Sequence, residues 1–295
     1  EYIFKGQDDG LVSALVLGED GDLNTDIRAL YEQLGIAHVL AISGLHMSII
    51  AAGIWWSLGI MGLNYEMRNG ISLIGIWSYS IFVGMSVSII RASIMLTVML
   101  VVRSLWEEED LLSSLALAAL IILIGNPFQL YQVGFQLSFI ALLGIAFYQS
   151  VYHFIKHECS CAKSVLKVCR ILLPSICIGL FISPVIAYHF YEIPLLSVLL
   201  NVLLVPIFGL LLPLIFITLL VSAVMPGISF ILAYSILGFL GSIKSIGTFL
   251  ATLPFTTLII GRPSGLFLIL YYSMLCILGF KLKKIWNKRN YYLVG

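Results

Sequence analysis

Stretches of about 20 apolar residues recur between residues 39 and 280, and no other feature restricts the fold of this chain so strongly. A helix of that length crosses the roughly 30 Å hydrocarbon core of a bilayer. Within lipid, the backbone must pair its own polar groups, which leaves helices and closed barrels as spanning structures. The candidate spans are 39–63, 70–90, 92–106, 111–125, 136–155, 171–191, 195–225, 228–250 and 264–280. The sequence therefore predicts an all-α polytopic integral membrane protein with about nine transmembrane helices, within a range of about seven to eleven.

Two of these spans are irregular. The segment 92–106 is short and ends near Arg103, and 195–225 contains Asn201, Pro206 and Pro213. Proline removes a backbone donor, so a broken or re-entrant element is expected at 195–225. The composition agrees with a membrane protein, because 60% of the residues are hydrophobic and 11% are charged. A soluble chain of this length could not cover so much apolar surface.

The N-terminal region, residues 1–38, differs from the rest because it holds eight of the fifteen acidic residues. Residues 10–17 suit a short strand or helix, and 18–22 suit a turn. An amphipathic helix capped by Asp22 or Asn24 is then expected to end at Gly35. Its apolar face comprises Leu23, Ile27, Leu30, Tyr31 and Leu34. It is too short and too charged to span, so it is expected to lie on the bilayer or on the membrane domain.

Clusters of basic residues predict the orientation of the chain. The first cluster is Lys156, Lys163, Lys167 and Arg170, and the second is Lys281, Lys283, Lys284, Lys288 and Arg289. Four spans separate the clusters, so both fall on one side, which the positive-inside rule makes cytoplasmic. The chain therefore divides into an extracytoplasmic lead-in (1–38), a transmembrane domain (39–280) and a basic cytoplasmic tail (281–295). Because residue 1 is Glu, we expect the chain to be part of a longer protein.

The cysteines predict no disulfide framework, because their number is odd and three of the five lie in the expected cytoplasmic segment. His153, His157, Cys159 and Cys161 leave a zinc site open as an alternative. The spacing of the two cysteines is tight for a closed tetrahedral site, and no second pair follows. A solvated loop is the preferred interpretation, so neither a metal nor another cofactor is expected.

Polar residues within the apolar segments are candidates for function, since ionisable groups at membrane depth are costly. Arg91 falls between two expected spans near the outer boundary, where it could reach lipid headgroups. Lys244 lies among serines and glycines. Gln136, His189 and Asn201 suit either hydrogen bonding between helices or the lining of a pore.

The stretch HVLAISGLH (38–46) places a serine and a histidine on neighbouring helix faces. Gly44, Ser48 and Ala52 recur every four residues, a stripe of small residues that permits close helix packing. Ser43 with His46 also leaves open an intramembrane serine hydrolase. AISG resembles part of the G-x-S-G motif of rhomboid proteases. The first glycine is missing, however, and rhomboids take their histidine from another helix.

HVLAISGLH resembles the signature of the ComEC family, the inner-membrane channel for DNA uptake in natural transformation. The similarity continues in order through IRASIM (90–95), GFQLSF (134–139), YHF (188–190) and the region of Asn201. It covers roughly residues 10–280. The resemblance implies a channel that passes single-stranded DNA across the bacterial cytoplasmic membrane, with proteins that deliver and translocate DNA as partners. A homo-oligomer is left open.

The residues that match the family motifs are expected to line or brace the DNA path. They are His38, Ser43, Gly44, His46, Arg91, Gln136, Ser138, His189 and Asn201. Many full-length family members also carry an oligonucleotide-binding fold and a β-lactamase-like hydrolase domain. This chain shows no H-x-H-x-D-H motif and no room for a five-stranded barrel before residue 38, so no nuclease or other enzymatic activity is assigned to it. A small-molecule permease remains an alternative, because broken helices also suit that class.

Overall fold

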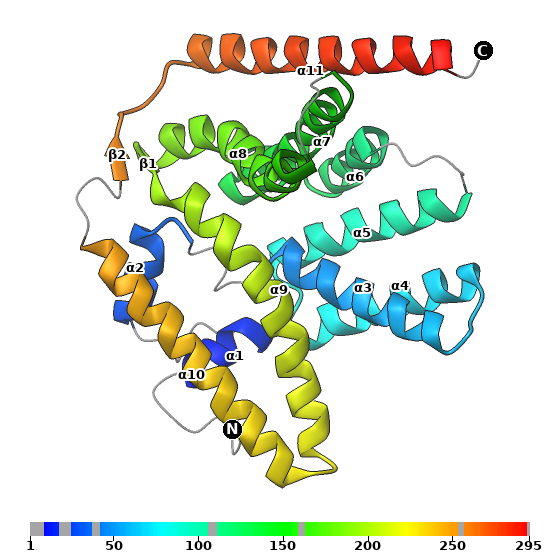
Figure 1. Cartoon of the computed structure of the whole chain (residues 1–295), viewed down its shortest axis with the longest axis vertical. Coiled ribbons are helices and arrows are strands. Elements are labelled where there is room, and N and C mark those ends of the chain that lie inside the picture. The colour runs from blue at the N-terminus through cyan, green and yellow to red at the C-terminus, as the bar shows by residue number, and fades with distance from the viewer. Residues whose placement is uncertain are drawn as a thin grey trace. The chain divides into compact units, whose positions relative to one another are not determined.

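The computed structural model of the chain is almost entirely helical (Figure 1), and it describes residues 9–17, 25–36, 42–105, 111–158, 163–252 and 257–293. The α-helices are α1 (Asp9–Leu17), α2 (Thr25–Gln33), α3 (Gly44–Ile60), α4 (Tyr65–Phe82), α5 (Val87–Leu105), α6 (Leu111–Gly125), α7 (Val133–Glu158), α8 (Lys163–Phe190), α9 (Leu196–Ser222), α10 (Pro226–Ala251) and α11 (Gly265–Leu293). A 3₁₀ helix, η2 (Pro127–Tyr131), precedes α7, and the short strand β1 (Glu192–Pro194) pairs with β2 (Thr257–Ile259).

The expected membrane spans coincide one by one with α3 to α11. Among the described residues, six helices are long and apolar enough to cross a membrane. They include Val87–Leu105, Val133–Lys156, Ser164–Phe190, Leu200–Ser222, Pro226–Ala251 and Gly265–Leu282. Two shorter apolar helices are Gly44–Ile60 and Leu111–Gly125. The chain is therefore an all-α polytopic membrane protein, as the apolar pattern predicts.

The expected boundary between the second and third spans, near residue 91, is wrong. α4 ends at Phe82, where Gly84 (φ 90°) and Met85 (φ 51°) turn the backbone into the left-handed region. The Met85 N–H donates to the Ser80 carbonyl and closes this turn. α5 then begins at Val87, so the segment expected to be short is a helix of 19 residues that contains Arg91. No charged residue marks the turn, so apolarity alone could not locate it.

The break expected within 195–225 is also not found, because α9 is assigned as one helix with Pro206 and Pro213 inside it. Similarly, α8 contains Pro174 and Pro184. Proline is tolerated in a membrane helix where neighbouring groups satisfy the freed backbone carbonyl. The segment 281–293, expected as a tail, continues α11 as a helix.

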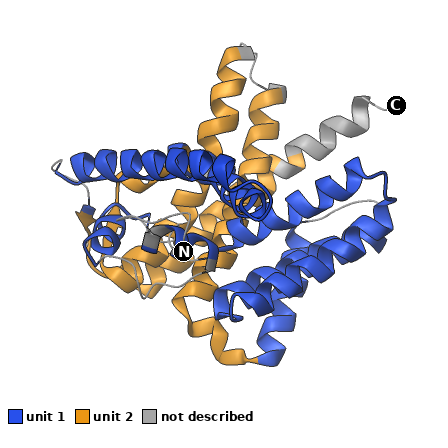
Figure 2. Ribbon diagram, turned by 90° about the horizontal axis from the view of Figure 1, so that it is seen from below, with its two compact units in different colours: residues 1–125, 203–257 blue, residues 126–202, 258–295 orange. Residues whose placement is uncertain are grey.

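The chain forms two compact units, coloured separately in Figure 2. Unit 1 comprises Glu1–Gly125 and Leu203–Thr257, and unit 2 comprises Asn126–Val202 and Leu258–Gly295. The division at residues 38 and 280 stays a prediction.

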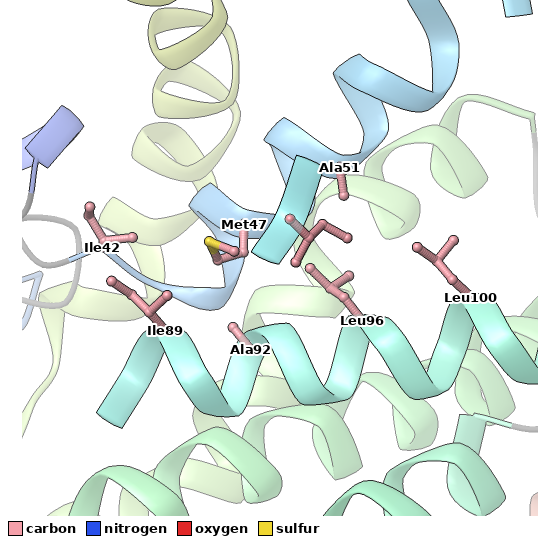
Figure 3. Packing of buried hydrophobic residues seen from close by; sticks show 8 residues of the cluster. Ile42, Met47, Ala51, Ile89, Ala92, Leu96 and Leu100 are labelled. Carbon is pink, nitrogen blue, oxygen red and sulfur yellow. The ribbon is translucent and has the colours of Figure 1, made fainter. Parts of the chain in front are cut away.

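The core of unit 1 lies where α3, α4 and α5 meet. Figure 3 shows apolar side chains of α3 facing those of α5. The buried cluster comprises Ile42, Met47, Ala51, Ile76, Ile89, Ala92, Leu96 and Leu100. Lipid tails are as apolar as these side chains, so close packing rather than escape from water holds such helices together.

Hydrogen bonds add specificity between α4 and α5. The Ser80 and Ser93 hydroxyl oxygens lie 2.7 Å apart, and the Asn69 amide donates to the Ser104 hydroxyl at 2.7 Å. Between these two contacts, the Trp77 indole N–H donates to Thr97 at 3.1 Å. The contacts advance in opposite directions along the two helices, so α4 and α5 run antiparallel.

The N-terminal amphipathic helix is confirmed as α2, whose buried residues Ile27 and Tyr31 lie on the expected face. Gly35 (φ 70°) ends it, with the Ile36 N–H donating to the Tyr31 carbonyl and the Gly35 N–H to the Glu32 carbonyl. α2 packs on α10, where Leu34 approaches Gly247. The helix is expected to lie on the bilayer or on the membrane domain. In the structure it packs on a membrane helix of unit 1.

Unit 2 is built on the antiparallel hairpin of α7 and α8, with α11 against α7. Gly144 of α7 lies so close to α8 that an added Cβ would stand 2.9 Å from the Ile178 Cα. This close approach is possible because glycine has no side chain. The Tyr272 hydroxyl of α11 donates to the Phe181 carbonyl of α8 at 2.6 Å.

Candidate functional site

The site built from HVLAISGLH lies at the N-terminus of α3. Ser43 is the N-cap residue, with extended backbone angles, and its carbonyl accepts from the Met47 N–H. The Ser43 Oγ lies 2.9 Å from the His46 Nδ1, and the Ser43 N–H donates to the same nitrogen at 3.2 Å. His46 therefore folds back over the first turn of the helix and satisfies a backbone donor that the helix itself leaves free.

These two contacts determine the roles of the histidine nitrogens. Because Nδ1 accepts the Ser43 N–H, a neutral His46 carries its proton on Nε2, and the Ser43 hydroxyl is the donor to Nδ1. His46 is 2% exposed, so the ring lies within the protein. A serine hydroxyl that donates to an imidazole is also the first contact of a nucleophile–base pair. In this chain the same histidine nitrogen also accepts the Ser43 N–H, the contact of a helix-capping pair.

We expect Ser43→Ala to lower the free energy of unfolding by about 1 kcal/mol, the usual contribution of one hydrogen bond, because it removes the contact of the hydroxyl with the His46 Nδ1. Thermal unfolding of the detergent-purified protein would measure this change, with Ser43→Thr as the control that keeps the hydroxyl. A serine-reactive phosphonate should label neither the wild-type protein nor the variants. Labelling of the wild type that disappears in Ser43→Ala would establish a nucleophile and contradict the capping interpretation.

The first member of the stripe of small residues on α3 faces α5. A Cβ built on Gly44 would lie 3.9 Å from the Ala92 Cβ, an ordinary van der Waals contact. Ser48, whose hydroxyl donates to the Gly44 carbonyl, and Ala52 are both exposed. Gly44 is exposed as well, and the space beside it would admit a Cβ, so within the described residues these three positions show no approach that requires small side chains.

Arg91 lies in the second turn of α5 and is 6% exposed. Its Nε has no hydrogen-bond partner among the residues that the structure describes. The side chain therefore does not extend to lipid headgroups, which was the alternative that the sequence left open. A buried guanidinium without an acidic partner in the described part of the chain is costly and calls for an anion or water.

Two of the expected residues, Gln136 and His189, come together in unit 2. The His189 Nε2, in the last turn of α8, lies 2.9 Å from the Gln136 Oε1 in the first turn of α7. The Gln136 amide also donates to the Leu130 carbonyl of η2 at 3.0 Å. Ser138 follows in α7, where its hydroxyl donates to the Gly134 carbonyl. Gln136 therefore joins η2, α7 and α8 at one end of the helical hairpin.

The remaining expected residues stay apart from these groups. Asn201 lies in α9, where its Oδ1 is buried. This oxygen has no hydrogen-bond partner among the described residues. His38 lies outside the described residues, as do Cys159 and Cys161 of the zinc alternative. Within the described ranges, no group of three or more His, Cys, Asp or Glu side chains could hold a metal ion.

The structure adds a pair that the sequence did not single out. Arg262, in the loop after β2, places its guanidinium 4.2 Å from the centre of the Tyr188 ring and donates to the Tyr188 hydroxyl. Tyr188 also meets His189 edge-on, with 5.2 Å between the ring centres. The partners are 74 residues apart, so local spacing could not predict that they pair. Tyr188 is marked in the sequence by the YHF motif.

Comparison with known proteins gives two matches. A family model described as Competence protein matches residues 15–285. ComE operon protein 3 of Bacillus subtilis (strain 168) is 28% identical over 199 residues, which cover 68% of this chain and 24% of that protein. The aligned part is thus about a quarter of the relative's length. No solved structure matches the chain.

Proposed function

Because the chain belongs to the Competence protein family, we propose that its membrane helices form a channel that passes single-stranded DNA across the bacterial cytoplasmic membrane during natural transformation. Two findings support the proposal. The family match covers nearly the whole chain, and the segments that resemble the DNA-uptake channel family lie within it.

The observation that carries the proposal is Arg91. A helix long enough to span the membrane holds a guanidinium that is 6% exposed and has an unpartnered Nε among the described residues. DNA brings one phosphate per nucleotide, and arginine presents planar donors suited to phosphate oxygens. A single such contact binds weakly enough to release the strand, which conduction requires.

The other expected residues fall into two sets within this proposal. In unit 1, Ser43 and His46 brace the start of α3, and Gly44 faces Ala92 of α5. In unit 2, Gln136 and His189 hold the ends of α7 and α8 together, while Ser138 and Asn201 offer polar groups. Their roles as DNA-path residues remain proposals. His38 belongs to the same motif, although it lies outside the described residues.

The proposed setting follows the distribution of charge. The acidic N-terminal region (1–38) lies outside, and the basic segment 281–295 lies in the cytoplasm. The proposed partners are the lipid bilayer, single-stranded DNA, and competence proteins that deliver DNA and drive its movement. Assembly as a homo-oligomer is compatible with this arrangement. We assign no cofactor and no catalytic residue.

We expect deletion of the protein from a transformable host to leave labelled DNA bound outside the cell while none enters the cytoplasm. Because the aligned part is a quarter of the relative, the host's complete protein is deleted and restored. Nuclease protection in spheroplasts would separate external from internal DNA. A strain that imports DNA normally after deletion would contradict the proposal. If deletion instead abolished uptake of a small solute and left DNA import unaffected, and restoring the protein restored that uptake, the permease alternative would be favoured.

A further inference from the structure

We propose that one end of unit 2, formed by Tyr131, Tyr188, Arg262 and their neighbours, is a docking site for single-stranded nucleic acid, in which Arg262 contacts phosphate and the aromatic rings stack on bases. This inference rests on the proposed DNA channel and names the surface that first holds the strand.

Hydrogen bonds bring four segments together at this end. Gln136 joins η2 to the start of α7 and to the end of α8 through His189. Arg262 joins the end of α8 to the loop after β2. The Tyr191 carbonyl accepts the Ile260 and Gly261 N–H groups at 3.1 and 3.0 Å. These hydrogen bonds join residues far apart in the sequence and hold the loops together in one surface.

Tyr191 shows how firmly this surface is held. Its φ is 66°, in the left-handed region that a tyrosine adopts at a cost. The two hydrogen bonds to its carbonyl maintain that conformation. Such strain is retained where the surrounding structure requires a particular path of the chain.

The chemistry of the surface suits a single strand. Large aromatic side chains are exposed here, in η2 and where α8 ends: Phe128, Tyr131, Phe190 and Tyr191. The Arg262 guanidinium is also exposed, and no ion pair joins it to an acidic side chain in the part of the chain that the structure describes. Aromatic faces accept every base, and a cation tracks the phosphates, the combination that sequence-tolerant single-strand sites use.

Tyr188 favours a strand over lipid headgroups as the occupant. An arginine that serves a bilayer extends freely toward the headgroups. Arg262 is instead held against the Tyr188 ring and by its hydroxyl. Its guanidinium is thus oriented before a ligand arrives, which lowers the entropic cost of binding. In the proposed orientation, the start of α7, the end of α8 and the start of α11 all face outward, where the strand arrives.

The test measures the anisotropy of a fluorescent poly(dT) oligonucleotide with the full chain in nanodiscs, over a series of salt concentrations. We expect Arg262→Ala to weaken binding about five- to tenfold and to reduce the slope of log affinity against log salt by about 0.7, the value for one phosphate on a single strand. Arg262→Lys should keep the slope. Tyr131→Leu should weaken binding about fivefold or more without changing the slope, since stacking releases no counterion.

Arg170→Ala is the matched control, because Arg170 is exposed near the opposite end of α8, about 27 Å from Tyr188 at 1.5 Å per residue. Equal losses in Arg262→Ala and Arg170→Ala would show general charge attraction and overturn the site. Unchanged poly(dT) binding, together with loss of co-purified anionic lipid in Arg262→Ala, would assign the pair to headgroups and overturn it as well. If the wild type imports and binds DNA while Arg262→Ala and Tyr131→Leu match it, the inference fails and the channel proposal stands. Failure of the wild type itself to bind would count against both.

Discussion

Replacing Gly144 with leucine is expected to prevent α7 and α8 from packing and to remove most of the folded protein from the membrane. A Cβ at this position would lie 2.9 Å from the Ile178 Cα and 3.1 Å from the Cys177 carbonyl oxygen. Both obstacles are backbone atoms, which cannot rotate away as a side chain can. We expect a loss of about 3 kcal/mol or more, at or beyond the upper end for overpacked sites.

The matched control is Gly53→Leu, because Gly53 is also inside an apolar helix and a Cβ there meets no atom within 4 Å. Immunoblots of membrane fractions and thermal unfolding in detergent would compare the two variants. Gly144→Ala should fall between leucine and wild type, since it adds the same Cβ but nothing more. Wild-type amounts and a wild-type melting temperature for Gly144→Leu would show that the hairpin does not pack as described.

The sequence predicts the helices better than their ends. Runs of apolar residues are enough to locate α3 to α11, because lipid requires helices of a minimum length. The turn at Gly84 and Met85 escapes this reasoning, since the residues on both sides of it are apolar. The proline-containing α9 escapes it for another reason. Whether a proline breaks a helix depends on the groups around it, which the local sequence does not show.

In the candidate site, too, contacts within one helix could be predicted from the sequence and contacts between helices could not. Ser43 and His46 are three residues apart, so their proximity follows from helix geometry alone. The 2.9 Å contact between Gln136 and His189 joins residues 53 apart, and it depends on how two helices pair. The burial of Arg91 depends likewise on the turn at Gly84, because a span boundary at residue 91 would have placed the guanidinium at the surface. Local spacing is readable from sequence, whereas contacts between helices are not.

Arg91→Met is expected to reduce DNA uptake about tenfold or more while the protein remains at least as stable as the wild type. Methionine removes the charge and fills part of the arginine volume. Replacing a buried ion pair by apolar side chains is often neutral or stabilising, by roughly 1 kcal/mol or more. Arg91 has no acidic partner among the described residues, so its replacement leaves no opposite charge unpaired. A merely structural residue could not show this combination, because its loss would lower both stability and uptake.

Arg91→Lys separates charge from geometry in the same experiment. Lysine keeps the positive charge but offers a point charge instead of a planar set of donors, so we expect uptake between that of methionine and wild type. Labelled DNA inside the cytoplasm, membrane levels and melting temperature would be measured for each variant. If Arg91→Met accumulates normally and imports DNA at the wild-type rate, Arg91 does not contact the strand. If it instead unfolds, and uptake falls only in proportion to the protein lost, the guanidinium holds the helices together, and the phosphate contact must lie elsewhere.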